Sequence, residues 1–158
     1  MAQLTFQDIQ LANFVLGHAM LFRLPLPQGW RLKRGFAHPD LHATHRRGQV
    51  VWVASADAHY LLQHEEGPAL EFTITVRTRA LKAGRETQPT VVGPHPAREE
   101  WATIRRGPPW RRREARRVRL TWSCPETERH FRLELVGRVP DEMFQELLTA
   151  WQRLRCHG

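Results

Sequence analysis

VRLTWSCPETERHFRLELVGRVPDEMFQELLTAWQRLRCH, residues 118–157, is the stretch that decides the fold. Apolar and polar residues alternate over residues 118–124 and again over 129–135. This period of two is typical of strands that bury one face. Beyond Pro140 the apolar residues follow helical spacing and form a stripe of Phe144, Leu147, Leu148, Trp151 and Leu154. The sequence therefore predicts two strands joined by a short turn at 125–128, followed by a helix.

The alternation also predicts how the two strands pair. If Cys124 lies opposite Arg129, the apolar residues of both strands face the same side. The other predicted partners are Trp122 with Phe131, Leu120 with Leu133, and Arg119 with Glu134. A shift of one residue would move the apolar side chains of one strand into water, so the pattern specifies this register strongly.

The rest of the chain predicts more strands. Alternating or apolar runs lie at residues 20–26, 41–45, 50–54 and 70–76. A strand or a short helix fits residues 4–16, 55–68 and 97–104, whereas glycine, proline and polar residues predict loops at 82–96 and 105–117. We predict an α+β fold in a single domain, residues 1–158. In it, a twisted antiparallel sheet of five to seven strands packs against a C-terminal amphipathic helix.

The composition limits the classes of protein to which the chain can belong. The chain has 158 residues, of which 41% are hydrophobic, enough for a globular domain with its own core. It has no run of 18 or more apolar residues, so no transmembrane segment is expected. The apolar segment 9–22 is interrupted by polar residues and no cation precedes it, which does not fit a secretory signal. We expect a cytoplasmic protein.

Arginine dominates the charge. The formal net charge is +8, and only Lys33 and Lys82 among the basic residues are lysines. A basic segment at residues 105–119 makes nucleic acid a candidate partner, because arginines grip phosphates and a tryptophan stacks on bases. The candidate nucleic-acid-binding residues are Arg105, Arg106, Trp110, Arg111, Arg112, Arg113, Arg116 and Arg117. An acidic protein, an anionic membrane surface, a solvated loop and the codon usage of a GC-rich genome also explain this segment.

The two cysteines are expected to approach each other. A helix of about fifteen residues, at ~1.5 Å each, returns along a strand of about nine residues toward the hairpin turn. This brings Cys156 toward Cys124, as two buried thiols, a disulfide or a metal site. His157 is adjacent, but the parity of the strand places His130 on the other face of the sheet. We therefore predict no bound metal and no cofactor.

Three more histidines, His38, His42 and His45, would share one face of a helix and could then bind zinc, copper or nickel. Pro39 and the neighbouring apolar pattern favour a loop and a strand instead. On a strand the three histidines do not share one face, so metal binding here is not expected.

Motifs for catalysis are absent. The chain has no glycine-rich phosphate loop, no H-E-x-x-H and no G-x-S-x-G. Leu24-Pro25-Leu26-Pro27-Gln28-Gly29-Trp30, together with the antiparallel strands and closing helix, resembles the PsbP-like α+β fold. The resemblance implies a non-enzymatic accessory or scaffold protein, although the basic charge departs from that family. We predict a non-catalytic module that binds an unidentified protein partner, with nucleic-acid binding, or a metal or redox site at Cys124 and Cys156, as alternatives.

Overall fold

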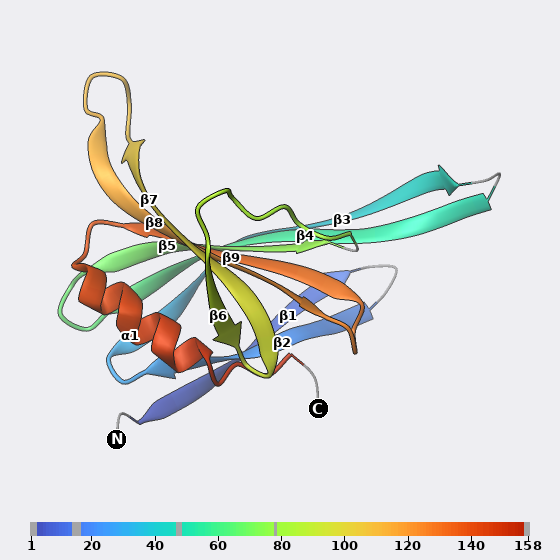
Figure 1. Ribbon diagram of the computed structural model, residues 1–158, viewed down its shortest axis with the longest axis horizontal. Coiled ribbons are helices and arrows are strands. Elements are labelled where there is room, and N and C mark those ends of the chain that lie inside the picture. The colour runs from blue at the N-terminus through green and yellow to red at the C-terminus, as the bar shows by residue number, and fades with distance from the viewer. Residues whose placement is uncertain (1–2, 14–16, 47–48, 78, 157–158) are drawn as a thin grey trace.

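The computed structural model describes residues 3–13, 17–46, 49–77 and 79–156 of the chain (Figure 1). The described residues form nine strands and one helix. The elements are β1 (Leu4–Asn13), β2 (Gly17–Pro27), β3 (Trp30–Arg46), β4 (Gln49–His64), β5 (Ala69–Arg77), β6 (Gln88–Val92), β7 (His95–Arg106), β8 (Arg113–Cys124), β9 (Arg129–Gly137) and α1 (Asp141–Trp151).

The strands form two antiparallel sheets. One has seven strands in the order β3-β4-β5-β9-β8-β7-β6, and the other contains β1 and β2. Antiparallel pairing and the C-terminal helix agree with the α+β prediction, but five to seven strands was too few. The additional strands come from segments without a clean alternation, namely residues 4–13, and from residues 88–92, which the sequence assigned to a loop.

The predicted register of β8 and β9 is confirmed. Cys124 pairs with Arg129, Trp122 with Phe131, Leu120 with Leu133 and Arg119 with Glu134. The apolar members of these pairs are buried, and the Trp122 and Phe131 rings stack with centroids 5.0 Å apart. This parity places the side chain of Cys124 on the buried face of the large sheet.

The buried face is covered by α1 together with the β1–β2 hairpin. Trp151 of α1 stacks on Phe72 of β5 at 5.2 Å between ring centroids. Phe22 of β2 makes edge-to-face contacts with Phe131 at 5.7 Å and with Trp122 at 6.1 Å. One hydrophobic core therefore joins the helix, the small sheet and the large sheet.

The helix is shorter than predicted. It ends at Trp151 after 11 residues, because the backbone N–H groups of Arg153 and Leu154 bond to carbonyls three residues back and close a tight last turn. The chain then runs alongside β2, where the N–H of Arg23 donates to the Arg155 carbonyl at 2.7 Å and the N–H of Arg155 donates to the Arg23 carbonyl at 3.2 Å. We call residues 152–156 the C-terminal tail. The tail, rather than the end of a helix, carries Cys156.

Residues 105–117 are only partly a loop. Strand β7 continues to Arg106 and β8 begins at Arg113, so Arg113–Arg117 belong to a strand that was predicted as loop. The β7–β8 hairpin projects from the body of the protein (Figure 1). Among the described residues, no helix is long and apolar enough to cross a membrane.

Candidate functional site

Three parts of the chain meet beside the C-terminal tail. The turn between β6 and β7 contacts the end of α1, where the N–H of Gly93 donates to the Trp151 carbonyl at 3.3 Å, and it also lies against the tail. A Cβ atom on Gly93 would overlap the Leu154 carbonyl oxygen, so this approach requires glycine. The turn places His95 at the start of β7, next to the tail and to the last residue of β8.

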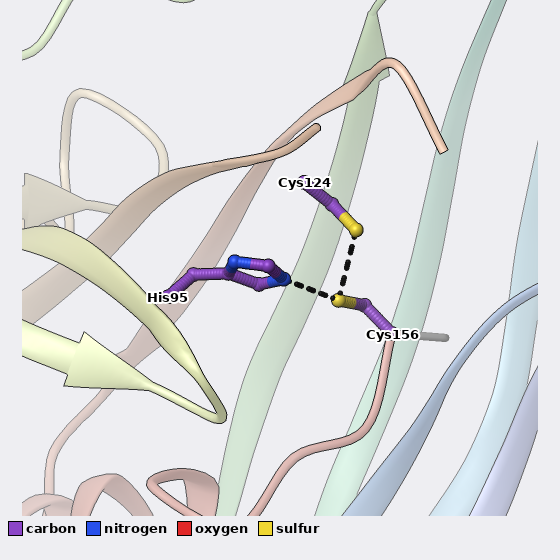
Figure 2. Close-up of side chains that lie close together, drawn as sticks. All are labelled: His95, Cys124 and Cys156. Carbon is purple, nitrogen blue, oxygen red and sulfur yellow. Dashed lines mark hydrogen bonds between the residues drawn. The ribbon is translucent and has the colours of Figure 1, made fainter. Parts of the chain in front are cut away.

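His95, Cys124 and Cys156 form a buried cluster at this junction (Figure 2). His95 Nε2 lies 2.9 Å from Cys156 Sγ, and Cys156 Sγ lies 3.1 Å from Cys124 Sγ. Neither cysteine is in a disulfide. The three residues are 6%, 1% and 5% exposed, in that order, so the cluster is closed to bulk water. Cys124 and Cys156 are thus brought together, as their sequence positions had indicated.

Glu126 lies at the edge of the cluster, in the turn between β8 and β9. Its Oε2 atom is 3.6 Å from Cys124 Sγ and 3.9 Å from His95 Nε2. Its side chain is half exposed. Glu126 therefore offers a carboxylate on the solvent side of two thiols and an imidazole.

Burial keeps Cys156 protonated. Loss of hydration, and after it the hydrogen bond to Cys124, raises the pKa of the Cys156 thiol to about 12. The thiol donates to Cys124 Sγ, and Cys124 Sγ in turn donates to Glu126 Oε2. Cys156 is therefore a poor nucleophile in this state, because the thiolate is the reactive form.

The spacing of the cluster is close to that of a tetrahedral metal site. Zinc bonds of ~2.3 Å to sulfur and ~2.0 Å to nitrogen or oxygen imply separations of about 3.8 Å between two sulfurs, about 3.5 Å between sulfur and nitrogen or oxygen, and about 3.3 Å between nitrogen and oxygen. The distance from Glu126 to Cys124 Sγ, 3.6 Å, already fits, whereas the distance from Glu126 to His95 Nε2, 3.9 Å, would have to shorten by about 0.6 Å. The sulfur–sulfur distance of 3.1 Å would have to widen by about 0.7 Å, and the distance of 2.9 Å between His95 Nε2 and Cys156 Sγ by about 0.6 Å.

His95 was not found from the sequence. The prediction considered His130, which lies on the opposite face of the sheet and bonds to Ser123 at 2.6 Å, and His157, which lies outside the described residues. The signal that identifies His95 is the register of β7 with β8. Ala97 pairs with Trp122, so His95 has the parity of Cys124 and faces the same side. That pairing joins distant segments, and the sequence assigned residues 82–96 to a loop.

The eight residues of the predicted basic site do not form one surface. Arg105, Trp110, Arg111, Arg112 and Arg113 are exposed at the end of the β7–β8 hairpin. Arg116 points toward the helix, where it pairs with Asp141 at 3.3 Å and lies over the Trp101 ring at 5.3 Å. Arg106 pairs with Glu71 at 3.7 Å, and Arg117 with Glu100 at 3.8 Å.

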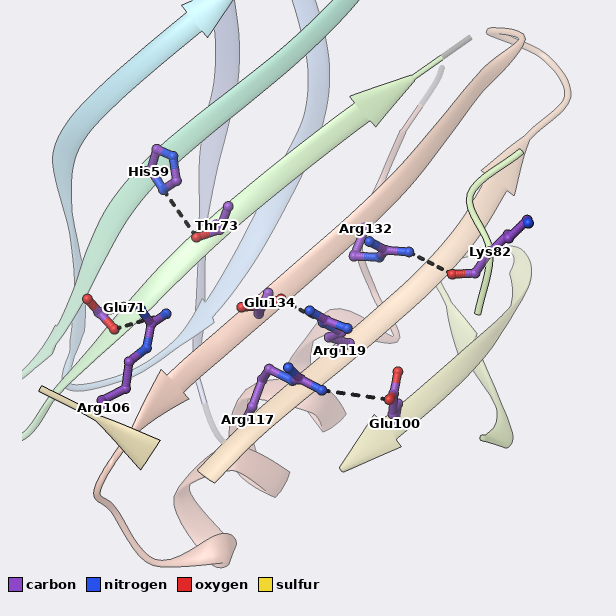
Figure 3. A network of polar contacts seen from close by, with 10 residues as sticks. All are labelled: His59, Glu71, Thr73, Lys82, Glu100, Arg106, Arg117, Arg119, Arg132 and Glu134. Carbon is purple, nitrogen blue, oxygen red and sulfur yellow. Dashed lines mark hydrogen bonds and ion pairs between the residues drawn. The ribbon is translucent and has the colours of Figure 1, made fainter. Parts of the chain in front are cut away.

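On the outer face of the large sheet, charged side chains are joined by ion pairs and hydrogen bonds (Figure 3). Arg119 donates to Glu134 at 2.6 Å, as their predicted pairing requires, beside the Arg117–Glu100 pair. Arg132 donates to the Lys82 carbonyl at 2.7 Å, and burial followed by repulsion from Arg119 lowers its pKa. Among the described residues of this face, Arg117 and Arg119 are thus interleaved with Glu100 and Glu134.

The histidines at 38, 42 and 45 lie on β3, as the strand interpretation predicted. Their backbone partners on β4 are Asp57, Val53 and Val50. The positions of their side chains fall outside the described residues.

Comparison of the chain with protein families, with curated proteins and with solved structures gave no match. The resemblance to the PsbP-like fold therefore stays a prediction.

Proposed function

We propose that the protein binds a zinc ion through His95, Cys124 and Cys156, and that the metal fastens the C-terminal tail to the large sheet. The observation that carries this proposal is the convergence of two thiols and one imidazole, all buried, with their ligand atoms within 4.8 Å of one another. Thiolate and imidazole ligands in a tetrahedral arrangement are those that zinc prefers.

The fourth ligand position supports a structural role. Catalytic zinc sites keep one position open to water or substrate, whereas structural sites fill all four with protein atoms. Glu126 lies on the solvent side of the cluster, 3.6 Å from Cys124 Sγ. We assign it as the fourth ligand. A metal held in this way would connect the turn after β6, the end of β8 and the tail.

The thiol pair also favours a second candidate, a disulfide between Cys124 and Cys156, because their sulfur atoms lie 3.1 Å apart. The other sequence-based predictions, a non-enzymatic accessory role and an unidentified protein partner, remain predictions.

Metal titration tests the proposal. The reduced, metal-free protein is titrated with Co²⁺ and then Zn²⁺, and the absorption of tetrahedral Co²⁺–thiolate complexes is recorded. We expect one ion per chain. Replacing a direct ligand should weaken binding by at least about 100-fold, since even residues that only orient ligands contribute ~10–100-fold. The variants are His95→Ala, Cys124→Ser and Cys156→Ser, and His130→Ala is the matched control because it removes an imidazole from the other face.

Two results would overturn the proposal. One is a reduced, folded protein that takes up no metal at micromolar concentrations and whose two thiols are both labelled after unfolding. The other is a protein isolated two hydrogens lighter than its sequence mass, which would establish the disulfide instead. Circular dichroism of each variant separates loss of a ligand from loss of the fold.

A further inference from the structure

The end of the β7–β8 hairpin concentrates positive charge. Residues 105–114, RRGPPWRRRE, contain five arginines and one glutamate, which gives a formal charge of +4. The whole chain has a formal charge of +8, so ten residues hold half of it. We call these residues the hairpin tip. Among the described residues, no ion pair engages Arg105, Arg111, Arg112 or Arg113.

The charge of the tip destabilises the hairpin that carries it. Arg106 and Arg113 are directly opposite each other at the last pair of the β7–β8 ladder. Like charges in that position destabilise a sheet. Glu71 pairs with Arg106 at 3.7 Å, but no carboxylate of the described residues pairs with Arg113. An anion bound at the tip would relieve this repulsion.

The tip also presents an exposed aromatic ring. Trp110 is 81% exposed, the largest exposure among the large apolar side chains of the described residues. The N–H of Arg111 donates to the Pro108 carbonyl at 2.9 Å and closes a turn with Pro109 and Trp110 at its centre. Gly107 has φ of 113° and lies so close to the Arg111 carbonyl that a Cβ atom would not fit. Two prolines and this close approach restrict the backbone that carries the ring.

We infer that the hairpin tip binds single-stranded nucleic acid. The arginines would contact consecutive phosphates, and Trp110 would stack on an unpaired base. A duplex hides the faces of its bases, so the exposed indole favours a single strand. A membrane surface fits less well, because the tip offers only one large apolar side chain to the bilayer. An acidic peptide would satisfy the arginines but leave the ring without a partner.

Fluorescence anisotropy of a labelled oligothymidylate tests the inference. Four phosphate contacts predict that log K falls with log salt with a slope of about −3 for a single strand, or about 50-fold between 50 and 200 mM salt. Replacing Arg111, Arg112 and Arg113 with glutamine should make the slope shallower by about 2. The matched control replaces the exposed arginines Arg79, Arg85 and Arg138 with glutamine, removing the same charge elsewhere.

The stacking contact has its own variants. Trp110→Ala should weaken binding between about 5- and about 100-fold, whereas Trp110→Phe should restore most of it because a phenyl ring still stacks. The inference is wrong if the tip and control triple variants share one salt slope, or if Trp110→Ala binds like the wild type. It is also wrong if phosphatidylserine vesicles or polyglutamate bind the protein and oligothymidylate does not. Unchanged unfolding midpoints show that the variants keep the fold.

Discussion

Zinc affinity should depend steeply on pH, because the ligands must lose protons before they bind. The folded metal-free protein holds the pKa of Cys156 at about 12. This thiol is therefore protonated throughout the neutral range, and binding the metal as a thiolate releases one full proton from Cys156. Removing that proton at neutral pH is unfavourable, and the metal–sulfur bond must offset this cost.

The release of this proton sets how strongly zinc affinity changes with pH. Each pH unit changes the apparent affinity tenfold for each proton released, which corresponds to about 1.4 kcal/mol. Between about pH 6.5 and pH 7.5, Cys156 alone should make zinc binding about tenfold tighter. The sign is fixed, since the proton competes with the metal for the same sulfur, so affinity rises with pH.

Competition with a chromophoric chelator of known affinity measures the effect at each pH. The wild type should show log K rising by at least about 1 per pH unit, and Cys156→Ser should lose about 1 from that slope in addition to its weaker binding. His130→Ala should keep the slope of the wild type. A wild-type affinity that does not change with pH, or a slope unaffected by Cys156→Ser, would refute the assignment of Cys156 as a thiolate ligand.

Two glycine-related predictions concern the turns on either side of the cluster. Gly93→Ala should weaken zinc binding and lower stability, because its Cβ atom would overlap the Leu154 carbonyl and displace the tail. The control is Gly67→Ala. Gly67 also has a positive φ, 109°, but a Cβ atom there would meet nothing within 4 Å, so this variant shows the effect of backbone strain alone. Equal loss of zinc affinity in both variants would contradict this reading. Glu128 has φ of 54°, so Glu128→Gly should raise the free energy of unfolding by about 1 kcal/mol, measured by denaturant titration; a decrease would show that the Glu128 side chain contributes more than its backbone strain costs.

The β8–β9 pairing was predictable because one face of both strands is buried. Residues such as Trp122 and Phe131 must point the same way, so the period of two carries the register. The long strands β3 and β4 lack this constraint over much of their length. Residues 49–55 of β4 pair with β3 but lie beyond the β4–β5 pairing, which covers residues 56–63. A two-stranded ribbon does not require one common buried face, so the sequence of this part carries no clear period.

The sequence predicted the two cysteines of the cluster but not its histidine, for a related reason. Cys124 and Cys156 belong to one continuous segment, in which strand parity and the return of the chain bring them together. His95 reaches them only through the pairing of β7 with β8 and through the contact of Gly93 with the tail. Neither contact leaves a periodic signal near His95. The short helix was missed as well, because Leu154 continues the apolar stripe although its backbone has left the helix.

The two proposed sites lie at opposite ends of one strand, which makes them independent of each other. Cys124 ends β8 and Arg113 begins it. Twelve residues of strand at ~3.3 Å each separate them by roughly 35–40 Å. Variants that far apart, with no shared contacts, affect stability and binding additively. Cys156→Ser therefore serves as a control for the nucleic-acid measurements, and the triple arginine variant as a control for the zinc titrations. Loss of both activities in either protein would point to a damaged fold and not to either site.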